Sequence, residues 1–201
     1  FSALNTLEKA IEKYPASSVI EEAYGAVLML TGRKDEAREI LTGNGGSSNT
    51  GSEGLRVLID DAVDTEDWNA AEEYAQRLLA GDDSIGAGLS AWKVWYLQQK
   101  FDTALKISEK LYEDFPESTE TAIVYIKTLV GMNRRLQAER IINQILPTES
   151  DAQKRSELYY LKSLTDDSEE EKLQSLRSAL FEDLQNIDAL LNIAILYTDM
   201  G

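Results

Sequence analysis

The sequence predicts an all-α protein, an α-solenoid of stacked antiparallel helix pairs with about 12 helices. Three observations favour this fold. Residue types recur at intervals of 34, apolar residues within each interval follow helical spacing, and short polar turns separate the helical segments. A helix with one apolar stripe cannot bury that stripe alone, so the pairs must stack on one another.

The repeat is visible in two columns of the sequence. One column consists of alanines separated by 34, 34, 33 and 34 residues: Ala3, Ala37, Ala71, Ala104 and Ala138. The next position in this column, 34 residues later, is Lys172. A second column keeps the same period through Gly25, Ile59, Trp92, Ile126, Tyr160 and Ala194. Two columns with one period indicate a repeat architecture.

The predicted elements are one helix, five helix pairs and a final helix. We name the first helix of each pair A and the second B, so the chain opens on a B helix and closes on an A helix. In order, their ranges are 2–14, 18–42, 52–80, 85–115, 118–146, 150–183 and 187–200.

Local signals support these elements in turn. The opening helix ends at Pro15 and the third pair ends at Pro116, because proline cannot continue a helix. Short polar turns divide the first, second and fourth pairs, at 31–35 (which contains Gly32), 64–67 and 131–134.

Capping and apolar spacing support the remaining elements. Ser168 and Glu171 form a capping box that starts the B helix of the fifth pair. Apolar residues at i, i+3, i+4 and i+7 mark A helices in the second pair and in the final helix: Leu55, Leu58, Ile59 and Ala62, then Leu190, Ile193, Ala194 and Tyr197.

Three places depart from the regular pattern. Residues 43–52 are rich in Gly, Ser and Asn, and we predict a flexible loop there, inside a single domain that covers 1–201. The third pair places Trp92 where a small residue is expected, and its aromatic residues either pack in the core or line a ligand pocket. In the fifth pair, Tyr160 and Lys172 leave the register open.

These features together resemble the tetratricopeptide-repeat (TPR) family. Its pattern has a large and then a small residue in helix A, an aromatic residue or Leu three further on, Gly at the turn, Ala in helix B and Pro near the end. The residues that match are Tyr24, Gly25, Leu28, Gly32, Ala37 and Leu41; Ile193, Ala194, Tyr197 and Gly201; Ala3, Leu7, Ala10 and Pro15; and Phe101 to Lys106. The resemblance covers the whole chain and implies a right-handed superhelix.

Composition excludes several functions. The chain has no Cys and no His, which excludes disulfides, zinc sites built on these residues and triads with an imidazole base. Its net charge of −16 disfavours nucleic acid and anionic membranes as partners. No targeting segment and no membrane-spanning segment is visible, so the compartment stays unassigned, cytoplasmic by default. Because the chain starts without Met, we expect a fragment of a longer protein.

No catalytic or metal-binding constellation is visible, and we predict neither an enzyme nor a cofactor. The acidic runs at 60–73 and 166–171 lack the alternating acids, internal Gly and closing Glu of a calcium loop. We interpret both as solvated faces or helix starts.

The resemblance implies that selected A-helix positions face a concave groove that binds a peptide segment of another protein. The residues carried over as partner contacts are Glu22, Met29, Arg56, Leu89, Lys93, Tyr96, Glu120, Ile123, Lys127, Val130, Leu191 and Ile195. No Asn occupies the ninth A-helix position, so the family's carboxylate clamp is not expected. Three alternatives stay open: core packing by the apolar members, a structural homo-oligomer, and a small-ligand-binding domain.

Overall fold

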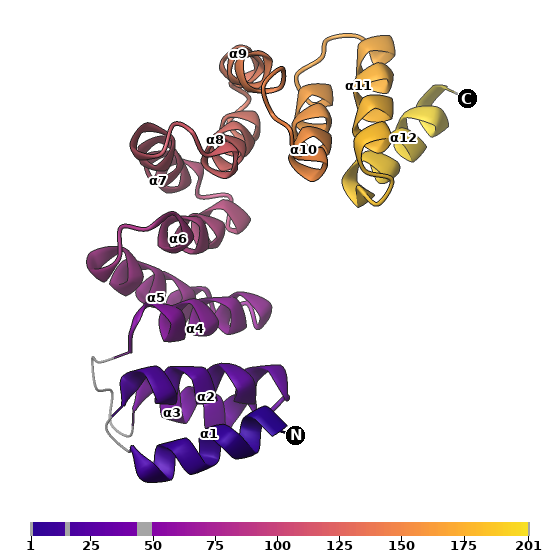
Figure 1. Cartoon of the computed structure of the whole chain (residues 1–201). Helices are drawn as coiled ribbons and strands as arrows, with labels where there is room; N and C mark the ends of the chain where they lie inside the picture. Colours follow the sequence, from indigo (N-terminus) through magenta and orange to yellow (C-terminus); the bar gives the residue numbers. More distant parts are fainter. Residues whose placement is uncertain (1, 15–16, 44–49, 201) are drawn as a thin grey trace. The chain divides into compact units, whose positions relative to one another are not determined.

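The computed structural model describes residues 2–14, 17–43 and 50–200, and these residues form twelve helices without a strand (Figure 1). The predicted all-α fold of about twelve helices is confirmed. The helices are α1 (Ser2–Lys13), α2 (Ser18–Leu30), α3 (Lys34–Thr42), α4 (Ser52–Asp64), α5 (Trp68–Gly81), α6 (Ile85–Leu97), α7 (Phe101–Asp114), α8 (Thr119–Gly131), α9 (Arg135–Ile145), α10 (Ala152–Ser163), α11 (Glu169–Glu182) and α12 (Ile187–Met200).

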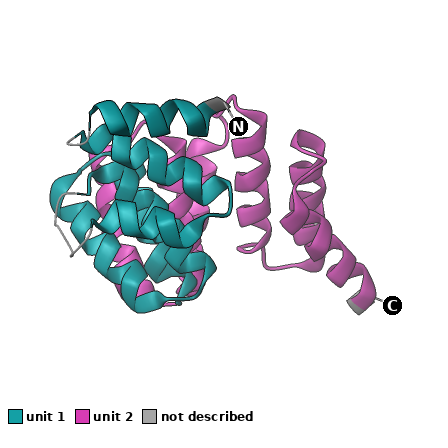
Figure 2. Cartoon of the chain, turned by 90° about the horizontal axis from the view of Figure 1, so that it is seen from below, with its two compact units in different colours: residues 1–98 teal, residues 99–201 magenta. Residues whose placement is uncertain are grey.

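The chain divides into two compact units, residues 1–98 and 99–201, coloured teal and magenta in Figure 2. The single domain over 1–201 stays a prediction. Pro15 and residues 44–49 of the expected loop lie outside the described residues.

In unit 1 the A helices α2, α4 and α6 lie side by side, and the B helices α3 and α5 pack against them. The core includes Leu28, Ile59, Leu78 and Val94, all essentially inaccessible to solvent. Trp92 and Trp95 are buried as well, at 8% and 6% exposed. These positions support the interpretation of the third-pair aromatics as core residues.

In unit 2 helix α8 packs between α7 and α9, and α11 packs between α10 and α12. One apolar cluster joins α8, α9 and α10 and includes Ile126, Ile142 and Leu158. A second, smaller cluster joins α11 and α12 through Leu176, Ala179 and Ala189, with Tyr159 and Tyr160 packed against it.

The small-residue column has a direct packing cause. Ala37, Ala71, Ala104 and Ala138 are all completely buried, so these B helices have no room for a larger side chain there. Gly25 acts in the same way on an A helix, because a Cβ atom there would lie only 2.5 Å from Leu41 Cγ.

The turn between A and B helices also repeats in the backbone. Gly32 has φ +82°, and the residues one, two and three repeats later, Glu66, Gln99 and Asn133, have φ between 56° and 58°. The fifth pair differs, because its turn is fixed by side chains. Asp166 is buried and accepts hydrogen bonds from Lys162 Nζ and Ser175 Oγ. The predicted capping box of Ser168 and Glu171 follows it and is confirmed.

Candidate functional site

The candidate site is the surface of the A helices within each unit, here called the A-helix face of that unit: α2, α4 and α6 in unit 1 and, separately, α8, α10 and α12 in unit 2. In unit 1, Lys93 Nζ lies 2.9 Å from Asp60 Oδ1, which joins α6 to α4. Glu22 on α2 accepts a hydrogen bond from the Gly51 N–H at 2.9 Å and a longer one from Gly54. Glu22 therefore stabilises the N-terminus of α4, where a negative charge is favourable.

Arg56 connects α4 to the start of α6. Its guanidinium donates to Ser84 Oγ at 3.2 Å and lies 3.8 Å from Asp82 and 3.5 Å from Glu53. The space it fills is tight, since a Cβ atom on Gly86 would lie 2.6 Å from Arg56 Nη2. Hydrogen bonds from the Ser84 side chain and N–H, supported by Arg56, lower the pKa of Asp82 to about 2.

The remaining predicted residues of unit 1 are half-buried on the A-helix face. Met29, Leu89 and Tyr96 each keep part of their side chains accessible. The ring of Tyr96 stacks on Trp92 with a centroid separation of 4.5 Å, so the core holds this aromatic side chain in place.

In unit 2 two ion pairs join α8 to α10. Lys127 Nζ lies 2.8 Å from Glu157 Oε1, and Lys154 Nζ lies 3.4 Å from Glu120 Oε1. All three predicted cations, Arg56, Lys93 and Lys127, thus already have an acidic partner within the chain.

The apolar residues predicted in unit 2 differ in exposure. Ile123 is only 9% exposed and belongs to the core cluster, and Val130 packs partly against that cluster. Leu191 and Ile195 on α12 are 56% and 59% exposed. The role of each predicted residue in partner binding stays a prediction.

Sequence reasoning missed the acidic partners of the two lysines. A signal was present for one of them, because Asp60 and Lys93 occupy the same A-helix position in neighbouring repeats and carry opposite charges. The contact of Glu22 with Gly51 follows no repeat spacing, so the pattern could not have found it.

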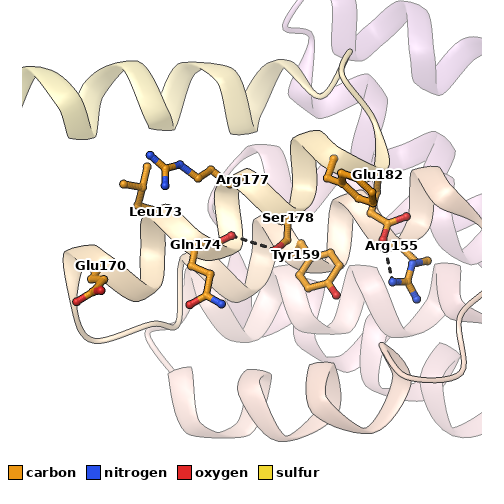
Figure 3. A pocket seen from close by; sticks show the side chains of 9 residues that line it. Arg155, Tyr159, Glu170, Leu173, Gln174, Arg177, Ser178 and Glu182 are labelled. Atoms are coloured by element: carbon orange, nitrogen blue, oxygen red, sulfur yellow. Dashed lines mark hydrogen bonds and ion pairs between the residues drawn. The ribbon is translucent and has the colours of Figure 1, made fainter.

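A hollow of about 730 Å³ lies on α10 and α11 (Figure 3). Both of its arginines are engaged. Arg155 Nη2 lies 2.8 Å from Glu182 Oε1, and Arg177 Nη2 donates to the Tyr197 hydroxyl at 2.8 Å. Among the residues that line the hollow, Ser178 donates its hydroxyl hydrogen to the Gln174 carbonyl oxygen at 3.1 Å.

A smaller hollow of about 230 Å³ is formed by residues of α9, the end of α10, α11 and α12. Ile195 lines it together with two cationic side chains, Arg135 and Lys172. In the described parts of the chain, no group of three or more Asp and Glu residues is placed to hold a metal ion. None of the described helices is long and apolar enough to cross a membrane.

The structure of YrrB, described as a TPR protein with an unusual peptide-binding site, superposes with a TM-score of 0.66 at 17% identity, over 96% of this chain and 100% of YrrB. The chain has the TPR fold. A TPR protein from Parabacteroides merdae ATCC 43184 superposes with a TM-score of 0.64 at 15% identity, over 98% of this chain and 77% of that protein. No protein-family model and no curated protein sequence matches the chain.

Proposed function

We propose that this TPR-fold chain is a non-catalytic interaction scaffold that binds a peptide segment of another protein along its A-helix face. One observation carries the proposal. In each unit two neighbouring A helices lie side by side and are joined at their surface by ion pairs: α4 and α6 by Asp60–Lys93, and α8 and α10 by Glu157–Lys127 and Glu120–Lys154. A surface held in this way is preorganised, which reduces the entropy lost on binding.

The chemistry of the face favours a partner segment of mixed charge. Its ion pairs alternate with half-buried apolar side chains such as Met29, Leu89 and Val130. Apolar side chains of an extended or helical peptide could bury against these residues, while its charged groups exchange with the ion pairs. The net charge of −16 gives long-range attraction to basic or mixed segments. The peptide-binding site in the name of YrrB is consistent with this use of the fold.

The experiment selects binding peptides from a random display library on the 201-residue chain and measures their dissociation constants. We expect Leu89→Lys and Val130→Lys to weaken a selected peptide by about tenfold or more, because each places a charge against apolar peptide contacts. The matched controls are Leu79→Lys and Leu136→Lys, on exposed positions of the B helices α5 and α9. Equal losses from both pairs of variants, in proteins with unchanged circular dichroism, would remove the A-helix face as the site.

A second candidate is self-association through α12. Five of its large apolar side chains are exposed to at least 47% of their area: Ile187, Leu190, Leu191, Ile195 and Tyr197. Apolar surface of this extent on one helix favours contact with another protein surface. Light scattering over a range of concentrations tests the idea, and a mass that stays monomeric at every concentration would exclude it.

A further inference from the structure

Lys172 stands where four earlier B helices have a completely buried alanine. The column of Ala37, Ala71, Ala104 and Ala138 continues at Lys172 on α11, and its side chain is half-buried. Leu176, one turn later on the same face of the helix, is only 3% exposed, as a core leucine is expected to be. A lysine at such a contact needs extra space, and its ammonium group must reach water or an anion.

The hollow of about 230 Å³ in unit 2 provides space for the Lys172 side chain. Its apolar part is formed by Leu164, Leu176, Ile195 and Leu196, and its polar groups come from Arg135, Ser163, Lys172 and Asn192. The Asn192 side-chain amide donates to the Asp188 carbonyl oxygen at 2.8 Å. Within the described residues, neither the Arg135 nor the Lys172 side chain makes a hydrogen bond or an ion pair.

Arg135 on α9 and Lys172 on α11 differ in this respect from the cations of the A helices. The cations of the A-helix face, Arg56, Lys93, Lys127 and Lys154, all have a carboxylate within 4 Å. The chain has 36 acidic residues against 20 basic ones, yet no described carboxylate pairs with Arg135 or Lys172. Two like charges beside one hollow repel each other, and an anion from another molecule would relieve that repulsion.

We infer that this hollow binds a carboxylate side chain of a partner segment, with a neighbouring apolar side chain of the same segment against Ile195 and Leu196. Arginine suits a carboxylate because its planar guanidinium can donate two parallel hydrogen bonds. The volume of 230 Å³ is below the ~300–1,000 Å³ of sites that enclose whole drug-sized molecules, so the hollow fits one or two side chains of a longer ligand.

The inference rests on the proposed function, because it gives the chemistry of one part of the peptide that the scaffold binds. It also changes which cations are expected to bind the peptide's acidic group. To bind an acidic group of the peptide, Lys93 and Lys127 would have to break their ion pairs with Asp60 and Glu157. The side chains of Arg135 and Lys172 have no ion pair to break.

The test titrates the ¹⁵N-labelled chain with two capped tetrapeptides, Ala-Glu-Leu-Ala and Ala-Gln-Leu-Ala, followed by NMR. We expect the Glu peptide to shift the side-chain amide of Asn192 and the backbone amides around Leu164, Lys172 and Ile195. It should bind about fivefold more tightly than the Gln peptide, and the difference should shrink in about 0.5 M salt, which screens the charges.

The variant Arg135→Gln/Lys172→Gln should remove the difference between the two peptides. The control Arg140→Gln/Lys106→Gln makes the same change in net charge at exposed positions and should preserve it. Lys172→Met retains the apolar stem of the side chain, so it separates loss of charge from loss of packing. Equal binding of the Glu and Gln peptides, or shifts confined to other residues, would overturn the inference.

The inference and the proposed function fail in different ways. If a display-selected peptide is weakened by Leu89→Lys and Val130→Lys but not by Arg135→Gln/Lys172→Gln, the inference is wrong and the scaffold proposal stands. If the Glu tetrapeptide binds as expected but no selected peptide depends on the A-helix face, the hollow is a binding site and the proposed function is wrong.

Discussion

Units 1 and 2 are built from the same kind of helix pair, but they differ in the number of polar side chains that they bury. Among the described residues of unit 1, the buried charged or polar side chain is Asp61. Unit 2 buries eight such residues: Ser108, Thr121, Thr128, Ser156, Ser163, Thr165, Asp166 and Ser175. The repeat therefore constrains the size of a core side chain more strongly than its polarity, provided that every buried hydroxyl finds an acceptor.

The buried charge of unit 1 links α3 to α4. Asp61 accepts from Arg38 Nε at 2.7 Å and lies 2.9 Å from Lys34 Nζ. Burial alone would raise the pKa of Asp61, but the hydrogen bonds from Arg38 and Lys34 outweigh it and hold the pKa below its ordinary value.

The hydroxyl groups of unit 2 are satisfied mainly by carbonyl oxygens. Ser156 Oγ donates to the Ala179 carbonyl at 2.8 Å and accepts from Asn186 Nδ2 at 2.8 Å. Thr128 Oγ1 donates to the Val124 carbonyl one turn earlier. These hydrogen bonds offset the cost of burying a hydroxyl group, so a small polar residue can occupy a core position.

The largest expected effects come from the apolar cores. Leu58→Ala in unit 1 and Leu158→Ala in unit 2 each remove a side chain that is at most 2% exposed, and each should lower the free energy of unfolding by about 2–5 kcal/mol. All three tryptophans, Trp68, Trp92 and Trp95, belong to unit 1, so urea unfolding followed by fluorescence reports on that unit. Circular dichroism reports on the helices of both.

Fluorescence and circular dichroism together show whether the two units unfold separately. In a repeat protein each element is coupled mainly to its neighbours, so Leu158→Ala should shift the dichroism midpoint more than the fluorescence midpoint. Leu58→Ala should shift fluorescence at least as much as dichroism. Coincident curves for both variants would show that the two units unfold as one.

Asp61→Asn should have the next largest effect, about 1–3 kcal/mol, because it leaves two cations without their shared carboxylate while both remain partly hydrated. Since the pKa of Asp61 is lowered on folding, its contribution is present above the unfolded-state pKa of about 3.9 and is lost as pH falls through the folded-state pKa. The difference in unfolding free energy between wild type and variant should be constant from about pH 5 to 7 and shrink below about pH 4. A pH-independent difference would contradict the assignment.

The sequence predicted the helix pairs because buried small residues and helical apolar spacing are properties of short segments. It could not predict the backbone of most turns. Gly32 and Asn133 are residue types that favour a positive φ, but Glu66 and Gln99 also adopt a positive φ without such a signal. The candidate site stays a prediction, and contacts such as that of Glu22 with Gly51 depend on packing that no spacing encodes.

Ser156→Ala tests the polar core of unit 2. The change removes an acceptor for Asn186 and a donor to Ala179, and we expect a loss of about 1–2 kcal/mol in unfolding free energy. Ser178→Ala is the matched control, since its hydroxyl only bonds the Gln174 carbonyl within α11 at an accessible position, and it should cost less than about 0.5 kcal/mol. Equal losses would mean that the buried hydroxyls of unit 2 contribute no more than surface ones.

The smallest expected effects are those of the ion pairs on the two A-helix faces, and they should differ between the units. The carboxylate of Asp60 is 63% exposed in its pair with Lys93, whereas Glu157 is 26% exposed in its pair with Lys127. Double-mutant cycles with Lys93→Gln/Asp60→Asn and Lys127→Gln/Glu157→Gln should therefore give coupling energies of about 0.2–1 kcal/mol, with the larger value in unit 2, where water screens the charges less. A larger coupling for Lys93 would reverse that order and would make the unit 1 pair the harder one for a bound peptide to displace.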